Sequence, residues 1–190
     1  MRRSTVAATA VLCVLALTVT VLALRFPGIR SSDVDVNDGG VWIVNSSDGV
    51  MGRLNVEARE LDARIATVGD DLDIEQSGYT LVETGARGFS PINTSSITRA
   101  PMAETPPGST VHVGADRIVV AAPDGRVWVL TRDSAASFAA AQTEPVYKGD
   151  GSLPTVAVAE DGTAFVLDKD KLITIPAGNG DPSASEPKQI

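Results

Sequence analysis

The longest apolar stretch of the chain runs from Val6 to Leu24, and its most polar members are three threonines and one cysteine. At about 1.5 Å per residue, a helix of this length spans about 28 Å, which matches the hydrocarbon core of a bilayer. The pattern predicts a transmembrane helix over residues 6–25, preceded by a short cytoplasmic tail over residues 1–5. Pro27 and Gly28 end this helix, so residues 26–32 are expected to form a juxtamembrane linker.

A cleaved signal peptide is the alternative interpretation of this stretch. Such a peptide has a shorter apolar core, of about 7–15 residues, followed by a small-x-small cleavage site. Val21-Leu22-Ala23 matches that site poorly, and the bulky residues after it disfavour cleavage, so an uncleaved anchor is expected. Arginines flank the run on both sides and barely set its orientation. The short tail and the long acidic domain favour an inside amino terminus and an outside carboxyl-terminal domain.

Beyond the linker, a pattern of apolar and turn residues returns about every 38 residues. The segment Asp33–Gly40 aligns at this offset with Asp71–Gly78. A fourth copy, shifted by a few residues, extends from Val156 to Ile175. Successive steps of 38 also relate three apolar pairs, Ile43-Val44, Leu81-Val82 and Val119-Val120. Such a period is typical of an architecture built from repeated units.

Each copy has the pattern of a short strand, a turn and another short strand. β-Branched residues dominate Val41–Val44 and Ile118–Ala121, and Asp-Gly pairs supply turns, as at Asp48-Gly49. The predicted fold class is all-β, with about four β-propeller-like blades over residues 33–177, whether or not they close into a full propeller. A sandwich of hairpins is the alternative. Residues 178–190 are rich in Gly, Pro and Ser and are predicted to be a disordered tail.

Charge narrows the range of partners. Of the 16 basic residues, four arginines lie in the first 32 positions, so residues 33–190 carry 12 basic and 24 acidic groups, a net charge of −12. This balance argues against a nucleic-acid partner, because such binding depends mainly on Lys and Arg. The only cysteine, Cys13, lies in the apolar run, so the chain has no internal disulfide and no Cys-based metal site.

Candidate chemistry is sparse. His112 is the only histidine, and no nucleophile pattern accompanies it, so we interpret it as a partly exposed strand residue. The run Asp33-x-Asp35-x-Asn37-Asp38 resembles the start of a calcium loop. However, Asp38 replaces the obligatory turn glycine and Val44 replaces the bidentate glutamate. A loose calcium site at the acidic starts of the repeats, which include Asp70, Asp71 and Asp73, is the remaining alternative.

Trp42 and Trp128 are interpreted as core residues rather than as a sugar-stacking pair, because they fall in different strands of their units. Asn45 and Asn93 begin glycosylation sequons, which matter only where that pathway exists. Ser90 follows a glycine but does not form Gly-x-Ser-x-Gly. The sequence therefore predicts no catalytic residue, no cofactor and no metal ligand.

The flanking markers carry a resemblance. The leading Arg-Arg pair, the apolar run, the segment Val34–Asn45 and the following Asp-Gly-x-x-Gly-Arg-Leu-Asn55 resemble one family of proteins. These are large actinobacterial membrane-anchored surface proteins that carry fibronectin type III or other Ig-like domains. The resemblance covers most of residues 1–175. It implies a cytoplasmic tail, one membrane helix and a propeller-like repeat region, with Ig-like modules further on, and it supplies no catalytic residue.

Together these observations predict a single-pass cell-membrane protein whose carboxyl-terminal domain lies outside the cytoplasm. Its expected role is non-catalytic binding or scaffolding of envelope proteins or glycans. Two alternatives remain open, a propeller-type glycan-active enzyme and a truncated fragment of a larger surface protein with Ig-like or fibronectin type III domains. The enzyme would require His112 and acidic side chains to meet at one channel mouth.

Overall fold

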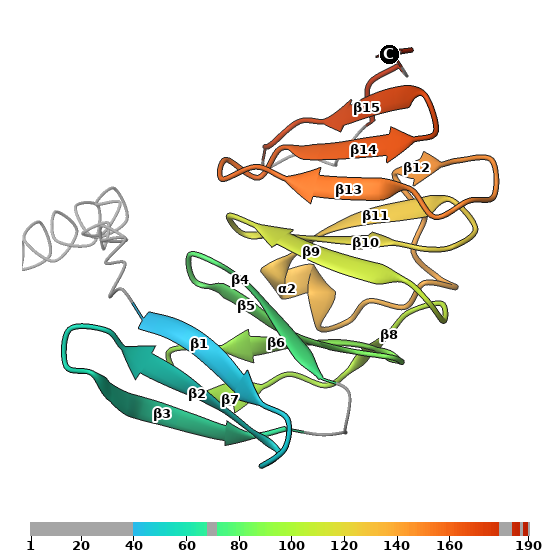
Figure 1. Cartoon of the computed structure of the whole chain (residues 1–190). Coiled ribbons are helices and arrows are strands. Elements are labelled where there is room, and N and C mark those ends of the chain that lie inside the picture. The colour runs from blue at the N-terminus through green and yellow to red at the C-terminus, as the bar shows by residue number, and fades with distance from the viewer. Residues whose placement is uncertain (1–39, 68–71, 179–183, 187, 190) are drawn as a thin grey trace, which may run out of the picture. The chain divides into compact units, whose positions relative to one another are not determined.

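The computed structural model describes residues 40–67, 72–178, 184–186 and 188–189. Over these residues, alternating apolar strands build four antiparallel sheets that follow one another along the chain (Figure 1). Sheet A contains β1 (Gly40–Asn45), β2 (Val50–Asn55) and β3 (Glu60–Ala66). Sheet B contains β4 (Asp73–Ser77), β5 (Thr80–Gly85), β6 (Gly88–Asn93), β7 (Thr98–Arg99) and β8 (Ala103–Glu104).

The two later sheets each have four strands in chain order. Sheet C contains β9 (Thr110–Gly114), β10 (Arg117–Ala121), β11 (Arg126–Thr131) and β12 (Tyr147–Lys148). Sheet D contains β13 (Thr155–Val158), β14 (Ala164–Asp168), β15 (Lys171–Ile175) and β16 (Lys188–Gln189). A single helical turn, α2 (Arg132–Ala135), follows β11 and is capped by the Thr131 side chain.

The predicted Asp-Gly turns connect neighbouring strands. Gly49, Gly125 and Gly162 all have positive φ, of 62°, 87° and 85°. Asp161 Oδ1 accepts a hydrogen bond from the Thr163 amide at 2.8 Å, which stabilises the turn before β14. Aspartate supplies the local acceptor and glycine adopts the left-handed backbone without a side-chain clash.

The repeat of 38 residues is confirmed at the level of strands. β2, β6 and β11 begin at residues 50, 88 and 126, at equal spacing. At the same spacing, β1 corresponds to β5, which is the second strand of sheet B. The position that corresponds to β4 falls on residues 35–39, outside the described residues. β1 therefore holds the second-strand position of its unit.

Neighbouring sheets pack face to face through three apolar clusters. The A–B cluster centres on Trp42, Met51 and Leu81, the B–C cluster on Phe89 and Trp128, and the C–D cluster on valines and isoleucines of β10, β11, β14 and β15. The first strands also touch in order, since β4 contacts β9 and β9 contacts β13. Successive antiparallel sheets that stack in this way form a β-propeller-like array and not the two-layer sandwich considered above.

Both ends of the chain bear on the predicted domain boundaries. No helix among the described residues is long and apolar enough to cross a membrane, and the predicted span over residues 6–25 lies outside them. At the other end, part of the predicted disordered tail is ordered. β16 pairs with β15, and the Ser185 amide donates to the Thr174 carbonyl at 2.8 Å. Backbone pairing to an open strand edge overrides the polar composition of this segment.

Candidate functional site

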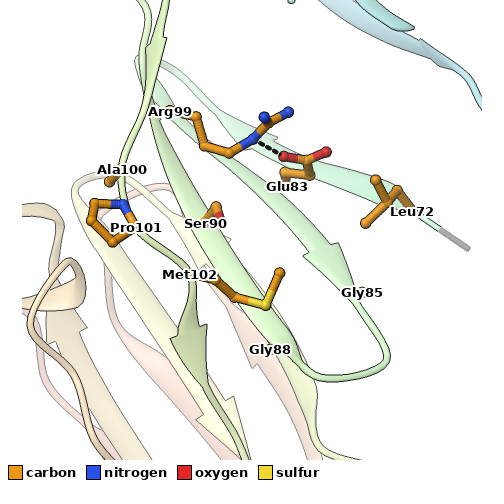
Figure 2. A pocket seen from close by; sticks show the side chains of 9 residues that line it. All are labelled: Leu72, Glu83, Gly85, Gly88, Ser90, Arg99, Ala100, Pro101 and Met102. Atoms are coloured by element: carbon orange, nitrogen blue, oxygen red, sulfur yellow. Dashed lines mark hydrogen bonds and ion pairs between the residues drawn. The ribbon is translucent and has the colours of Figure 1, made fainter. Parts of the chain in front are cut away.

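A pocket of about 220 Å³ lies against sheet B (Figure 2). Glu83 on β5 and Ser90 on β6 are direct cross-strand partners in its wall. Leu81 and Ile92 lie two positions away on the same strands and belong to the A–B cluster. Because residues two apart in a strand point the same way, the pocket opens on the face of sheet B that packs against sheet A. Its lining comprises Leu72, Glu83, Gly85, Gly88, Ser90, Arg99, Ala100, Pro101 and Met102.

A buried ion pair forms the polar wall of this pocket. Glu83 is only 4% exposed, and its Oε2 accepts a hydrogen bond from Arg99 Nε. Arg99 also donates from Nη2 to the Ala66 carbonyl at the end of β3, at 2.6 Å. The guanidinium is therefore committed to a carboxylate oxygen and to the neighbouring sheet. Pairing of this kind offsets the large cost of removing two charges from water.

The second oxygen of Glu83 is different. Glu83 Oε1 is buried and has no hydrogen-bond partner among the described residues. In Figure 2 this oxygen points away from Arg99, on the side of Leu72. A buried acceptor without a partner costs about 1–3 kcal/mol, and more when it is charged. The site therefore contains an unsatisfied carboxylate oxygen next to open space.

Glycines keep the floor of the pocket open. Gly85 and Gly88 face each other across the β5–β6 ladder. A Cβ atom at Gly88 would lie 2.0 Å from the Ala103 carbonyl oxygen, and Gly88 has a φ of +154°. Only glycine permits β8 to approach β6 this closely. Met102, just before β8, is 37% exposed and forms part of the apolar wall.

A second buried carboxylate lies between sheets C and D. Asp168 on β14 is 3% exposed and accepts a hydrogen bond from the Tyr147 hydroxyl at 2.8 Å. Burial, together with the hydrogen bond to Asp168, raises the pKa of Tyr147 to about 12. Ser152 Oγ donates more weakly to the other Asp168 oxygen, at 3.4 Å. Because its oxygens have these donors, Asp168 serves to join the two sheets.

His112 lies on β9 and its side chain is 33% exposed, which confirms the prediction of a partly exposed strand residue. Its Nδ1 is 3.9 Å from Glu75 Oε1 on the neighbouring first strand, β4. The structure thus brings the histidine close to an acidic residue that the sequence had not singled out. The spacing of 37 residues between the two, close to one repeat, is a signal that could have linked them.

The tryptophans are core residues, as predicted. Trp42 is 5% exposed and Trp128 is 1% exposed. Trp128 Nε1 donates to the Thr143 carbonyl at 2.9 Å, and its ring meets Phe138 edge to face, with centroids 5.6 Å apart. The two indoles lie in different sheet interfaces, so they do not form a sugar-stacking pair.

The remaining candidates have mixed outcomes. Asn45 and Asn93 are exposed at strand ends, where Asn93 Oδ1 accepts from the amides of the next turn at 3.0 Å. The acidic run of residues 33–38 lies outside the described residues, as do Asp70 and Asp71. Within the described ranges, no group of three or more His, Cys, Asp or Glu side chains is placed to hold a metal ion.

Sequence reasoning missed Glu83 and Arg99. A signal was present for Glu83, because strand alternation in Leu81-Val82-Glu83 places the carboxylate on the same face as an apolar residue. Its partner is a residue of a two-residue strand, β7, which no pattern predicts.

Comparisons with known proteins add information on the fold. No family model and no curated protein match this sequence. The structure is similar to dihydro-heme d1 dehydrogenase NirN in complex with DHE, with a TM-score of 0.59, 18% identity and coverage of 89% of this chain and 38% of that one. It is also similar to the Kuenenia stuttgartiensis hydrazine synthase, with a TM-score of 0.52, 14% identity and coverage of 81% and 47%. The chain therefore spans less than half the length of both structures.

A third similar structure is the β-propeller domain of Cps50 (Swd1) from Myceliophteria thermophila, with a TM-score of 0.39, 10% identity and coverage of 75% and 66%. At the identities of the first two structures, the likeness describes the fold and carries no activity, ligand or partner to this chain.

Proposed function

We propose that this chain is a membrane-anchored binding or scaffolding module whose propeller-like domain lies outside the cytoplasm and binds envelope proteins. The apolar run of residues 6–24 supports the anchor, and the acidic domain behind it supports the outward orientation.

The observation that carries the binding role is the outer face of sheet A. Val41, Ile43 and Leu61 are 47%, 46% and 45% exposed. Ile43 lies one repeat before Leu81, which is 1% exposed because sheet A covers it. The same position is thus apolar in both units and covered in only one. An exposed aliphatic sheet face of this kind is typical of a protein interaction site.

The expected partner is an envelope protein that presents a complementary apolar sheet surface, because sheet faces are what cover the equivalent position in this molecule. Glycans are a weaker fit to this face. Sugar recognition depends on aromatic stacking and polar groups, and both tryptophans are buried.

A site-specific photocrosslinker tests this role in the full chain in its membrane. We expect a crosslinker at Ile43 to capture a distinct envelope protein, and the same crosslinker at exposed Asp170 on sheet D to capture none of it. The double variant Val41→Asp, Ile43→Asp should abolish association with the captured protein in a pull-down. Equal capture from both positions, or no capture from Ile43, would count against the proposal.

Membrane anchoring is tested separately. The full chain should stay with the membrane after alkaline carbonate extraction, whereas a chain that begins at residue 31 should not. Added protease should digest the domain in intact spheroplasts. Release of the full chain by carbonate would refute the anchor, and digestion only after lysis would refute the orientation.

A propeller-type glycan-active enzyme is the second candidate. The approach of His112 and Glu75 to 3.9 Å favours it, because acid–base catalysis requires two groups that reach one substrate. Incubation with envelope glycans should then release reducing ends, and His112→Ala and Glu75→Gln should each abolish the release. Product from these variants at the wild-type rate would exclude this pair.

A third candidate is the front region of a larger surface protein with fibronectin type III or Ig-like domains, as the sequence resemblance implies. The proteins of similar structure are themselves more than twice as long as their matched parts. An immunoblot of native cells with an antibody to the repeat domain tests this, since a band far above 19.7 kDa is expected. A single band at that mass would argue against it.

A further inference from the structure

We propose that the pocket beside Glu83 binds a small organic amine, a ligand with one primary ammonium group on a short apolar body. This site lies on the inner face of sheet B and is independent of the proposed docking face on sheet A. Its failure would leave the binding role of sheet A untouched.

The polar end of the pocket selects a hydrogen-bond donor. Glu83 is 4% exposed, and its Oε1 has no partner among the described residues. A carboxylate oxygen only accepts hydrogen bonds, so the group that satisfies it must donate. An ammonium donates with full charge assistance, which makes its bond to a carboxylate roughly twice as strong as that of a neutral donor.

An anion fits this end poorly. Arg99 already donates to Glu83 Oε2 and to the Ala66 carbonyl. A carboxylate ligand would therefore place a second negative charge beside Glu83 in a buried setting. Like charges at such a site are strongly unfavourable.

The rest of the pocket suits an apolar body. Leu72, Pro101 and Met102 supply the walls, and Gly85 and Gly88 supply a floor without side chains. The volume of about 220 Å³ exceeds the roughly 150 Å³ of an engineered cavity that accepts benzene. One ring or a short branched chain, together with an aminomethyl group, fills this space.

Benzylamine, benzyl alcohol and benzoate form a matched probe series, because they share the ring and differ in charge and donor capacity. With the full chain in detergent micelles, titration calorimetry should give saturable binding in the order benzylamine, then benzyl alcohol, then benzoate. We expect benzylamine to bind at least tenfold more tightly than benzoate. No saturable binding by benzylamine, or equal binding by all three, would overturn the proposal.

Glu83→Gln tests the role of the carboxylate. It retains the size of the side chain and removes its charge, and it should weaken benzylamine at least tenfold. Glu104→Gln removes an exposed carboxylate from the adjacent strand β8 and should change binding less than twofold. Unchanged affinity in a folded Glu83→Gln variant would refute the site.

Met102→Lys serves if Glu83→Gln fails to fold, because it places a tethered ammonium at the pocket wall. This variant should abolish benzylamine binding and raise the melting temperature, whereas Met102→Leu should retain binding. Circular dichroism confirms that each variant folds. Full benzylamine binding by a folded Met102→Lys would also refute the site.

Discussion

At the scale of single residues, Gly88 is where the backbone geometry leaves least room. A Cβ atom there would meet the Ala103 carbonyl at 2.0 Å and would require a φ of +154°. Gly88→Ala should therefore lower the free energy of unfolding by about 2 kcal/mol or more, through positive-φ strain and overpacking. Guanidinium chloride unfolding measures this loss.

Gly78→Ala is the matched control. Gly78 also has positive φ, of +54°, but a Cβ atom there would have no heavy atom within 4 Å. Only the left-handed strain remains, at about 1 kcal/mol. Equal losses in the two variants would show that the close approach of β8 does not determine the effect.

Tyr147 gives a prediction about pH. Its pKa in the folded chain is about 12, above the ordinary value of 10.0, so the folded state holds the phenol proton more tightly than the unfolded state does. The stability that this provides is complete below about pH 10 and is lost as the pH rises towards 12. Tyr147→Phe should lower stability by about 1–3 kcal/mol at pH 8, since Asp168 loses a buried donor.

The stability gap between wild type and Tyr147→Phe should then narrow between about pH 10 and 12, because only the wild type loses the contribution of this proton. Denaturant unfolding at several alkaline pH values measures the gap. A gap that stays constant over this range would contradict the raised pKa.

Some residue-scale features follow from the sequence and others do not. Strand alternation alone predicts that His112 is partly exposed. The burial of Trp42 and Trp128 follows from the size of their apolar surfaces. The Glu83–Arg99 pair does not follow, because sheets A and B must stack before the pair becomes buried. Propensity contains no information on that contact.

At the scale of elements, a side chain joins two first-described strands of neighbouring sheets. Gln76 on β4 accepts a hydrogen bond from the Trp42 amide and donates to the Gly40 carbonyl on β1, both at 3.0 Å. Gln76→Ala should lower stability by about 1–3 kcal/mol and speed hydrogen exchange at the Trp42 amide. Gln142→Ala, at an exposed position in the turn region after α2, should change neither quantity. Slow exchange at Trp42 in Gln76→Ala would exclude this role of the amide.

The long strands were predictable because their residues repeat. β2, β6 and β11 fall one period apart, and the Asp-Gly turns mark where they begin. The short outer strands were not predictable. β12 and β16 have two residues each and depend on edges that other strands leave open. Their sequences contain no alternation long enough to indicate a strand.

At the scale of the whole molecule, each apolar cluster joins two neighbouring sheets. Stability in such an array is roughly a sum of terms from units and their adjacent interfaces. Met51→Ala, at a fully buried position in the A–B cluster, should cost about 2–5 kcal/mol and raise hydrogen exchange in β1–β3 more than in β13–β15.

Ile173→Ala is the mirror experiment, since Ile173 is equally buried in the C–D cluster. Its exchange should rise in β13–β15 and not in β1–β3. A uniform rise over all sheets in either variant would show that the array unfolds as one cooperative unit.

The spacing of β2, β6 and β11 also has a consequence for how such a chain can evolve. Because every interface joins only adjacent sheets, duplication of one stretch of 38 residues adds one sheet and one interface and leaves the other contacts intact. Unequal recombination between copies can therefore change the number of sheets in whole steps. Length is then a heritable variable that selection can adjust separately from the packing of any single unit.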